Sequence, residues 1–190
     1  LSDMGLYKED KEDLVISPHQ FKTWKNIDLF IKAIPNIEGK KEVYNDGIEM
    51  HYMSGSLEKR KPKYKVNNEW IWETGIKNGM IYKGKVSNEE ITKAFKRQKC
   101  IVDMSVGESG NKLPYKSVNY SVLECMKYGG IPIVRNKSLV DGLITKENVI
   151  IVDEENIVNS ISEKVNFVMK NFNIFSEMKE KNFDLLKREF

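Results

Sequence analysis

The chain has 190 residues, enough for one domain with a packed core, and 40% of them are hydrophobic. Its 31 basic residues nearly balance 28 acidic ones, so the net charge of +3 does not by itself indicate a nucleic-acid-binding protein. Two cysteines, Cys100 and Cys125, exclude a disulfide-rich secreted scaffold and show no metal-ligand spacing. We expect both to be buried thiols. No apolar run approaches membrane-spanning length and no signal peptide is recognisable, so we expect a cytoplasmic protein.

The first third of the chain predicts one strand and one helix, joined by a polar loop. Residues 1–13 are charged and aperiodic, and we interpret them as a linker. The apolar run Leu14–Ile16 predicts a strand, which gives way to a loop at Ser17-Pro18. Apolar residues at helical spacing predict a helix over residues 27–34, ended by Pro35.

The loop between this strand and this helix carries two lysines, Lys22 and Lys25. In open α/β sheets, ligands bind where strands lead into helices, and two ammonium groups at that edge suit a diphosphate. The alternative is that both are solvated lysines in a lysine-rich chain. His19, in the same loop, is a candidate contact for a sugar, or a loop histidine without a binding role.

The middle of the chain predicts two further strands, at residues 42–45 and 80–82, and a helix over residues 68–79. Asp46-Gly47 predicts a turn between them. The most basic stretch, residues 57–65, contains Pro62, so we predict an exposed loop that either contacts DNA phosphates or is simply solvated. Its cations are Lys59, Arg60, Lys61, Lys63 and Lys65. Residues 87–90 have the pattern of a capping box at the start of another helix.

A fourth strand is predicted at residues 100–104, followed by a polar loop over 105–115 that either folds over a ligand or is slack. We expect a helix from about Ser117, closed by Gly129-Gly130, and then a buried strand at residues 131–134. The open amino terminus of that helix suits a phosphate. Glu124, about two turns inside, can accept hydrogen bonds from a pair of sugar hydroxyls. The alternative is a core helix with one solvated acid.

The remaining residues predict a sixth strand at 149–152, a helix over 157–168 and a last helix over about 174–190. Strands therefore alternate with helices along the whole chain. This order predicts an α/β fold, a doubly wound Rossmann-like parallel sheet of about six strands with ligands at the carboxyl ends of the strands.

The string Glu124-Cys125-Met126, followed by residues 129–134 (GGIPIV), resembles the donor-site helix of GT-B glycosyltransferases of group 1. In that family the Glu binds the nucleotide ribose, and a second Glu stands eight positions earlier, where this chain has Lys116. The family also holds the donor diphosphate with an Arg and, five positions on, a Lys. Lys25 matches the Lys, whereas Gln20 replaces the Arg and Lys22 compensates. The phrase at residues 22–25 (KTWK) resembles the phage DNA α-glucosyltransferases in particular.

The resemblance implies a set of donor-binding residues in three parts of the chain. The diphosphate contacts are Lys22, Lys25, Lys116, Ser117, Asn119, Tyr120 and Ser121, and Glu124 holds the ribose. Tyr82, Gly84 and Val86 correspond to the family's base-binding corner, where backbone groups contact the nucleobase. The Gly47 loop is expected to lie under the donor. The acceptor-side catalytic residues are implied to lie outside this chain.

The resemblance also implies a domain plan and a reaction. Residues 1–13 would be a linker or the remnant of an amino-terminal acceptor domain, residues 14–172 the donor domain, and residues 173–190 a helix that packs on the other half with part of its apolar face exposed. The reaction would be retaining transfer of a hexose from a nucleotide-diphosphate sugar, without cofactor or metal. The acceptor is modified phage DNA in the host cytoplasm, or else a glycan, lipid or protein. A non-catalytic binding module on the same fold is the remaining alternative.

Overall fold

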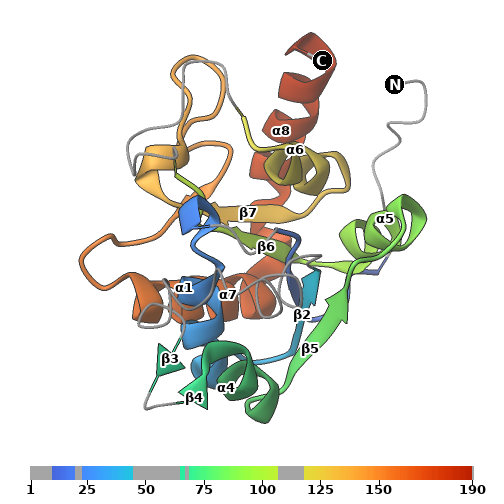
Figure 1. The fold of residues 1–190 in the computed structure, drawn as a ribbon. Coiled ribbons are helices and arrows are strands. Elements are labelled where there is room, and N and C mark those ends of the chain that lie inside the picture. Colours follow the sequence, from blue (N-terminus) through green and yellow to red (C-terminus); the bar gives the residue numbers. More distant parts are fainter. Residues whose placement is uncertain (1–9, 20–22, 45–64, 67–68, 107–117, 190) are drawn as a thin grey trace.

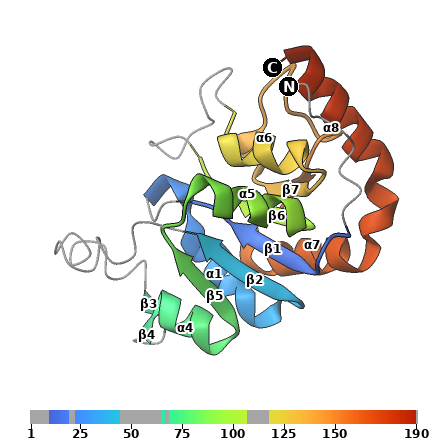
Figure 2. The same ribbon diagram turned by 90° about the vertical axis from the view of Figure 1, so that its right-hand side faces the viewer.

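The computed structural model describes residues 10–19, 23–44, 65–66, 69–106 and 118–189. Its main sheet has six parallel strands in the order β5-β2-β1-β6-β7-β8, which Figures 1 and 2 show from two sides. The strands span β1 Leu14–Ser17, β2 Lys40–Tyr44, β5 Met80–Gly84, β6 Cys100–Asp103, β7 Ile131–Val134 and β8 Ile150–Ile151. The prediction of a doubly wound parallel sheet of about six strands is confirmed.

Helices cover both faces of this sheet (Figure 2). One face packs against α1 (Ile27–Ala33), α4 (Ile71–Lys77) and α7 (Ile157–Asn171). The other packs against α5 (Asn88–Arg97), α6 (Tyr120–Lys127) and α8 (Ser176–Glu189). Every residue of β1, β6 and β7 is buried, as expected for parallel strands covered on both sides. Short 3-10 helices occur at η1 (Thr23–Lys25), η2 (Ile34–Asn36), η4 (Asn136–Ser138) and η5 (Phe172–Phe175).

Two helix ends follow the local chemistry of the sequence. Ser87 and Glu90 form the predicted capping box at the start of α5, with both reciprocal hydrogen bonds present. Gly129 adopts a left-handed conformation (φ 68°) just after α6, and its N–H and that of Gly130 bond to carbonyls of the last turn. Cys100 and Cys125 are both buried and unpaired, as predicted, and burial raises the pKa of the Cys125 thiol to about 12.

The predicted bounds of three elements differ from the structure in ways that affect the site or the fold. The helix expected over residues 68–79 begins only at Ile71, because β4 (Glu69–Trp70) pairs antiparallel with β3 (Lys65–Val66). The donor-site helix begins at Tyr120 rather than near Ser117, so Glu124 lies about one turn inside it. The sixth strand is confined to Ile150–Ile151, although Val149 and Val152 on either side are buried.

The carboxyl-terminal helix α8 packs on α6 within the domain (Figure 1). Phe183, Leu185 and Leu186 on α8 are buried. The exposed apolar face that we expected is therefore covered at these positions, while Ile174 in η5 remains 65% exposed. Phe190 lies outside the described residues. Of the helices in the described part of the chain, none combines the length and apolar character that crossing a membrane requires.

Candidate functional site

The candidate site lies where the strand order of the sheet reverses. From β1 the chain proceeds to β2 and β5 on one side, whereas β6, β7 and β8 follow on the other. The connections after β1 and β6 therefore leave the sheet at its switch point, and open α/β sheets bind ligands at the carboxyl edge there. These two connections and the start of α6 carry several of the predicted donor-binding residues.

Trp24 and Asn26, just before α1, contact the residues that follow β6. Trp24 O accepts a hydrogen bond from Val106 N at 2.9 Å, and Asn26 Nδ2 donates to Met104 O at 3.1 Å. Asn26 itself adopts a left-handed conformation with φ 46°, which asparagine tolerates better than most residues. These contacts hold η1, and with it the backbone of Lys25, against the end of β6.

Lys25 reaches across this edge to the amino terminus of α6. Its Nζ donates to Asn119 Oδ1 at 3.2 Å. Asn119 is the N-cap residue of α6, yet its side chain makes no capping hydrogen bond, because its oxygen faces Lys25 instead. Its Nδ2 is buried without a hydrogen-bond partner among the described residues. The structure thus brings together two of the predicted diphosphate contacts from distant parts of the chain.

A buried carboxylate that sequence reasoning missed lies beside these residues. Asp103 ends β6 and is 0% exposed. Its Oδ1 accepts a hydrogen bond from Ser105 N at 2.9 Å, and its Oδ2 accepts one from Ser121 Oγ at 3.0 Å. The Ser121 hydroxyl is therefore engaged with Asp103, so we expect only the Ser121 amide to reach a ligand. The sequence offered one indication of this site: Asp103 is an acidic residue at the end of a buried apolar strand, which is the edge where α/β sheets bind ligands.

His19 contacts the same carboxylate. It is 5% exposed, and its Nε2 lies 3.3 Å from Asp103 Oδ1 without the alignment of a hydrogen bond. Burial lowers the pKa of His19 below its ordinary value of 6.5; the charge of Asp103 opposes this shift and that of Lys25 adds to it. Burial alone would raise the pKa of Asp103, but His19, hydrogen bonds from Ser105 and the charge of Lys25 hold it below 3.8. Near neutrality the site thus holds a neutral imidazole and an ionised carboxylate.

These two shifts predict that the chain loses stability in acid. A folded-state pKa below the unfolded value means that the unfolded chain binds the proton more readily, so acid favours unfolding. His19 contributes its full stabilisation at pH values above 6.5, and this contribution is lost as the pH falls through the lower pKa that His19 has in the folded state. The contribution of Asp103 is lost at lower pH. We expect His19→Gln to lose less unfolding free energy than the wild type between about pH 7 and about pH 5. Urea titrations at each pH measure this.

The matched control for this prediction is His51→Gln, because the chain has 2 histidines and the control makes the same chemical change at the other one. It should retain the acid sensitivity of the wild type. Equal acid sensitivity in His19→Gln and the wild type would show that His19 titrates alike in the folded and unfolded states.

The other predicted donor-binding residues are spread more widely. Glu124 is half-buried in α6, one turn from Asn119, and no hydrogen bond or ion pair joins its carboxylate to another described residue. Tyr120, in the first turn of α6, is 78% exposed. Gly84 ends β5 with φ 65°, Tyr82 packs partly against the core, and Val86 packs partly against the α5 side. This corner is separated from β1 by β2.

Several predicted residues lie outside the described part of the chain. They are Lys22, Gly47, residues 57–64, the loop 107–115, Lys116 and Ser117. Lys65 belongs to β3, but its side chain is not described. In the described residues, no group of three or more His, Cys, Asp or Glu side chains is arranged to hold a metal ion.

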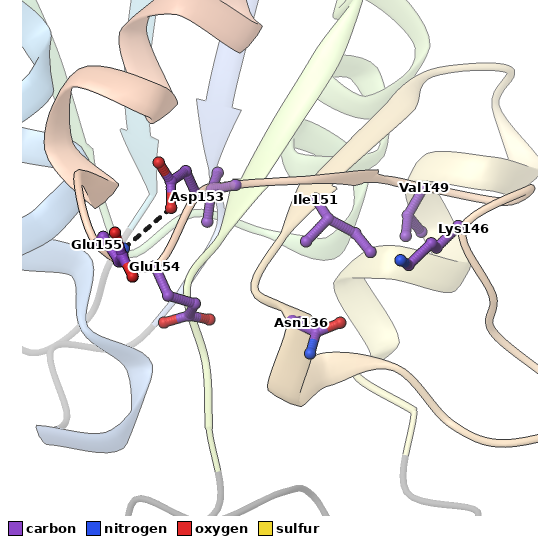
Figure 3. Close-up of a pocket in the computed structure, with 8 residues that line it drawn as sticks. Asn136, Lys146, Val149, Ile151, Asp153, Glu154 and Glu155 are labelled. Atoms are coloured by element: carbon purple, nitrogen blue, oxygen red, sulfur yellow. Dashed lines mark hydrogen bonds between the residues drawn. The ribbon is translucent and has the colours of Figure 1, made fainter.

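A separate pocket of about 600 Å³ runs along β8 (Figure 3). It lies between the turn at Asn136 and the segment that follows β8, where Glu155 N donates to Asp153 Oδ1 at 3.0 Å. Lys146 lines its other end. None of the predicted donor-binding residues lines this pocket, so it is separate from the cluster around Lys25.

A six-stranded parallel sheet, helices on both faces and a polar cluster at the switch point together define a doubly wound Rossmann-like domain. The chain matches the family model of glycosyl transferases group 1 over residues 5–184, and it belongs to that family. A comparison with curated proteins gave no match.

Solved structures of GT-B glycosyltransferases share this fold. TarM from S. aureus, a variant solved with Fondaparinux, alpha-GlcNAc-glycerol and UDP, has a TM-score of 0.68 at 16% identity; the match covers 96% of this chain and 34% of TarM. Anabaena HepE, solved with UDP and glucose, has a TM-score of 0.67 at 11% identity; the match covers 95% of this chain and 45% of HepE. The carboxyl-terminal domain of LpcC from Francisella tularensis has a TM-score of 0.64 at 14% identity; the match covers 93% of this chain and 84% of the LpcC domain.

These comparisons confirm the predicted resemblance at the level of family and fold. The chain spans about a third of the TarM chain and less than half of the HepE chain, and it corresponds in extent to the carboxyl-terminal domain of LpcC. The narrower resemblance to phage DNA glucosyltransferases stays a prediction.

Proposed function

We propose that this chain is the donor-binding half of a glycosyltransferase that transfers a hexose from a nucleotide-diphosphate sugar to an acceptor hydroxyl. The observation that carries the proposal is the contact between Lys25 Nζ and Asn119 Oδ1 at the switch point of the sheet. It places a cation beside the amino terminus of a helix whose N-cap side chain leaves the first amides uncapped. Both features favour a bound phosphate.

The proposed roles follow from the positions of the residues. Lys25 neutralises the leaving diphosphate, together with Lys22 and Lys116, and backbone amides of residues 119–121 add hydrogen bonds. Glu124 holds the ribose from the same helix, since one turn of α6 separates it from Tyr120. Backbone groups at residues 82–86 contact the base. In this proposal the lysines neutralise the negative charge of the diphosphate, so no metal ion is included.

The finer parts of the proposal are the donor, the stereochemistry and the acceptor. UDP as the nucleotide is supported by the complexes of the TarM variant and HepE with UDP. Retention of the anomeric configuration is part of the proposal because the family resemblance implies it. The acceptor, modified phage DNA or a glycan, lipid or protein, would be presented by a second domain. The basic residues 59–65 make DNA a candidate, for which binding would weaken steeply with salt.

Calorimetric titration with UDP and with 2′-deoxy-UDP, in the presence of EDTA, tests this assignment. We expect the wild type to bind UDP and to prefer it to 2′-deoxy-UDP, because Glu124 accepts a hydrogen bond from the 2′-hydroxyl. Glu124→Ala should weaken UDP binding by about 10-fold or more and should abolish the preference for the ribose 2′-hydroxyl, since hydrogen bonds to charged groups contribute about 1.5–3 kcal/mol.

Glu89→Ala, which removes an exposed acid on α5, is the control and should change neither affinity. A wild type that does not bind UDP would refute the proposed function. A Glu124→Ala variant that keeps the preference for UDP over 2′-deoxy-UDP would show that Glu124 does not hold the ribose.

A further inference from the structure

The proposed phosphate site contains a negative charge of its own. Asp103 is fully buried, and it interacts electrostatically with Lys25, the described cation of the site. Both are linked to α6, through Ser121 and Asn119 respectively. A diphosphate that contacts Lys25 would therefore place its own negative charges near a carboxylate that water cannot screen. Such a pair of like charges is unfavourable in a low-dielectric site unless another positive charge is present.

Two polar groups in this cluster, His19 Nε2 and Asn119 Nδ2, have no hydrogen-bond partner in the described part of the chain. His19 is 5% exposed, so water does not readily satisfy its ring nitrogen. Buried polar groups are nearly always paired in folded proteins, so these two atoms are open to a ligand. Of the two, only His19 can gain a positive charge near neutral pH.

We propose that His19 takes up a proton when a nucleoside diphosphate binds beside Lys25, so that the imidazolium neutralises Asp103 and leaves Lys25 available to the phosphates. This inference rests on the proposed function. The proton comes from solvent, and no covalent bond is made or broken. His19 is thus a positioning residue for donor binding, and Asp103 is the group through which it acts.

The charge balance of the described groups supports this step. The charged groups that act on His19 are Asp103, at the end of β6, and Lys25, in η1; Ser105 and Ser121 beside Asp103 are neutral. In the free chain the charges of Lys25 and Asp103 cancel, and burial lowers the pKa of His19, so its ring is neutral. A bound diphosphate adds negative charge beside these groups, which raises the pKa of His19 relative to its value in the free chain. Because the bound state holds the extra proton, affinity falls as pH rises.

Proton NMR of the histidine rings tests the proposal directly, because the chain has 2 histidines and His51→Gln identifies the His19 signal. The ring is titrated with pH in the free chain and in the chain saturated with UDP. We expect the midpoint of the His19 titration to move to higher pH on saturation. An unchanged or lowered midpoint, in a chain that binds UDP through Lys25, overturns this inference and leaves the proposed function standing. Absence of UDP binding refutes the proposed function itself.

Affinity measurements with UDP-glucose provide a second readout. Both of its phosphates are diesters with no proton that titrates near neutrality, so any pH dependence reports on the protein. We expect the wild-type affinity to fall on the order of 10-fold from about pH 6 to about pH 8. His19→Gln should bind with little pH dependence. The same pH dependence in His19→Gln as in the wild type would overturn the proposal.

Asp103→Asn is the complementary variant if His19→Gln does not fold. Its amide oxygen can still accept from Ser105 N, and its amide nitrogen can donate to Ser121 Oγ, so the local hydrogen bonds are kept without the charge. With the negative charge removed, we expect several-fold tighter UDP-glucose binding at about pH 8 and a smaller pH dependence. An affinity and pH dependence equal to those of the wild type would show that Asp103 does not act on the bound diphosphate.

Discussion

Lys25→Ala is expected to lower the affinity for UDP by about 10- to 100-fold, the equivalent of one charge-assisted contact of about 1.5–3 kcal/mol. Lys25 is held at the edge of the sheet by η1, and its Nζ already lies 3.2 Å from the N-cap residue of α6. Because the Lys25 side chain is already ordered, it loses little conformational entropy when a ligand binds, and most of the energy of the contact contributes to affinity. Uridine, which has no phosphate, should bind the variant and the wild type alike.

The fold should tolerate this substitution. Without Lys25 the side chain of Asn119 is free to cap α6, a role that asparagine fills well. The control is Lys93→Ala, which removes an exposed lysine paired with Glu89 on α5 and should leave UDP affinity unchanged. Titration calorimetry and thermal unfolding separate binding from stability. An unchanged UDP affinity in a folded Lys25→Ala chain would mean that the diphosphate binds elsewhere.

Gly130→Ala is expected to lower the free energy of unfolding by about 3 kcal/mol, at the upper end of the usual cost of overpacking. A Cβ at this position would lie 2.2 Å from Gln98 Nε2, 2.7 Å from Gln98 Oε1 and 2.8 Å from Cys125 Sγ. Gln98 is fully buried, and its Nε2 donates to Phe95 O at 3.2 Å. The amide therefore cannot move aside without losing that bond, and the connection between α6 and β7 must shift instead.

Two further variants isolate the clash at Gly130. Gly142→Ala, where φ is 74° and no atom beyond the adjacent residues lies within 4 Å of the added Cβ, should cost only about 1–2 kcal/mol of backbone strain. In a double-mutant cycle, Gln98→Ala should cancel part of the cost of Gly130→Ala, because it removes the atoms that the new methyl group meets. Chemical denaturation measures both. Additive costs in the cycle would show that Gln98 is not the obstacle.

Most of the fold could be predicted from the sequence, because its signals are local. Buried runs such as Cys100–Met104 and Ile131–Val134 indicated central parallel strands, and the Ser87–Glu90 capping box marked the start of α5. Two errors arose where pairing or packing overrode the local pattern. Trp70 belongs to β4 because it pairs with Lys65 of β3. The apolar side chains of α8 are buried because α8 packs on α6, which is distant in the chain.

The candidate site was only partly predictable. Lys25 was predicted because a lysine between a strand and a helix falls at the ligand-binding edge whatever the details of the fold. Asp103 was missed because two of its partners, His19 and Ser121, are distant from it in the chain. His19 was a candidate sugar contact, with a loop histidine that has no binding role as the alternative, and the structure shows it buried beside Asp103.

The chain's own short-range chemistry is thus sufficient for the alternation of strands and helices, the closure of α6 at Gly129 and the position of the lysine loop. Periodicity, caps and turns act over a few residues, so they can be read before the chain is folded. The charge balance of the candidate site depends on long-range packing. His19, Asp103 and Ser121 come from three separate segments, and they meet only because β1 and β6 are neighbours in the sheet and α6 packs across β6.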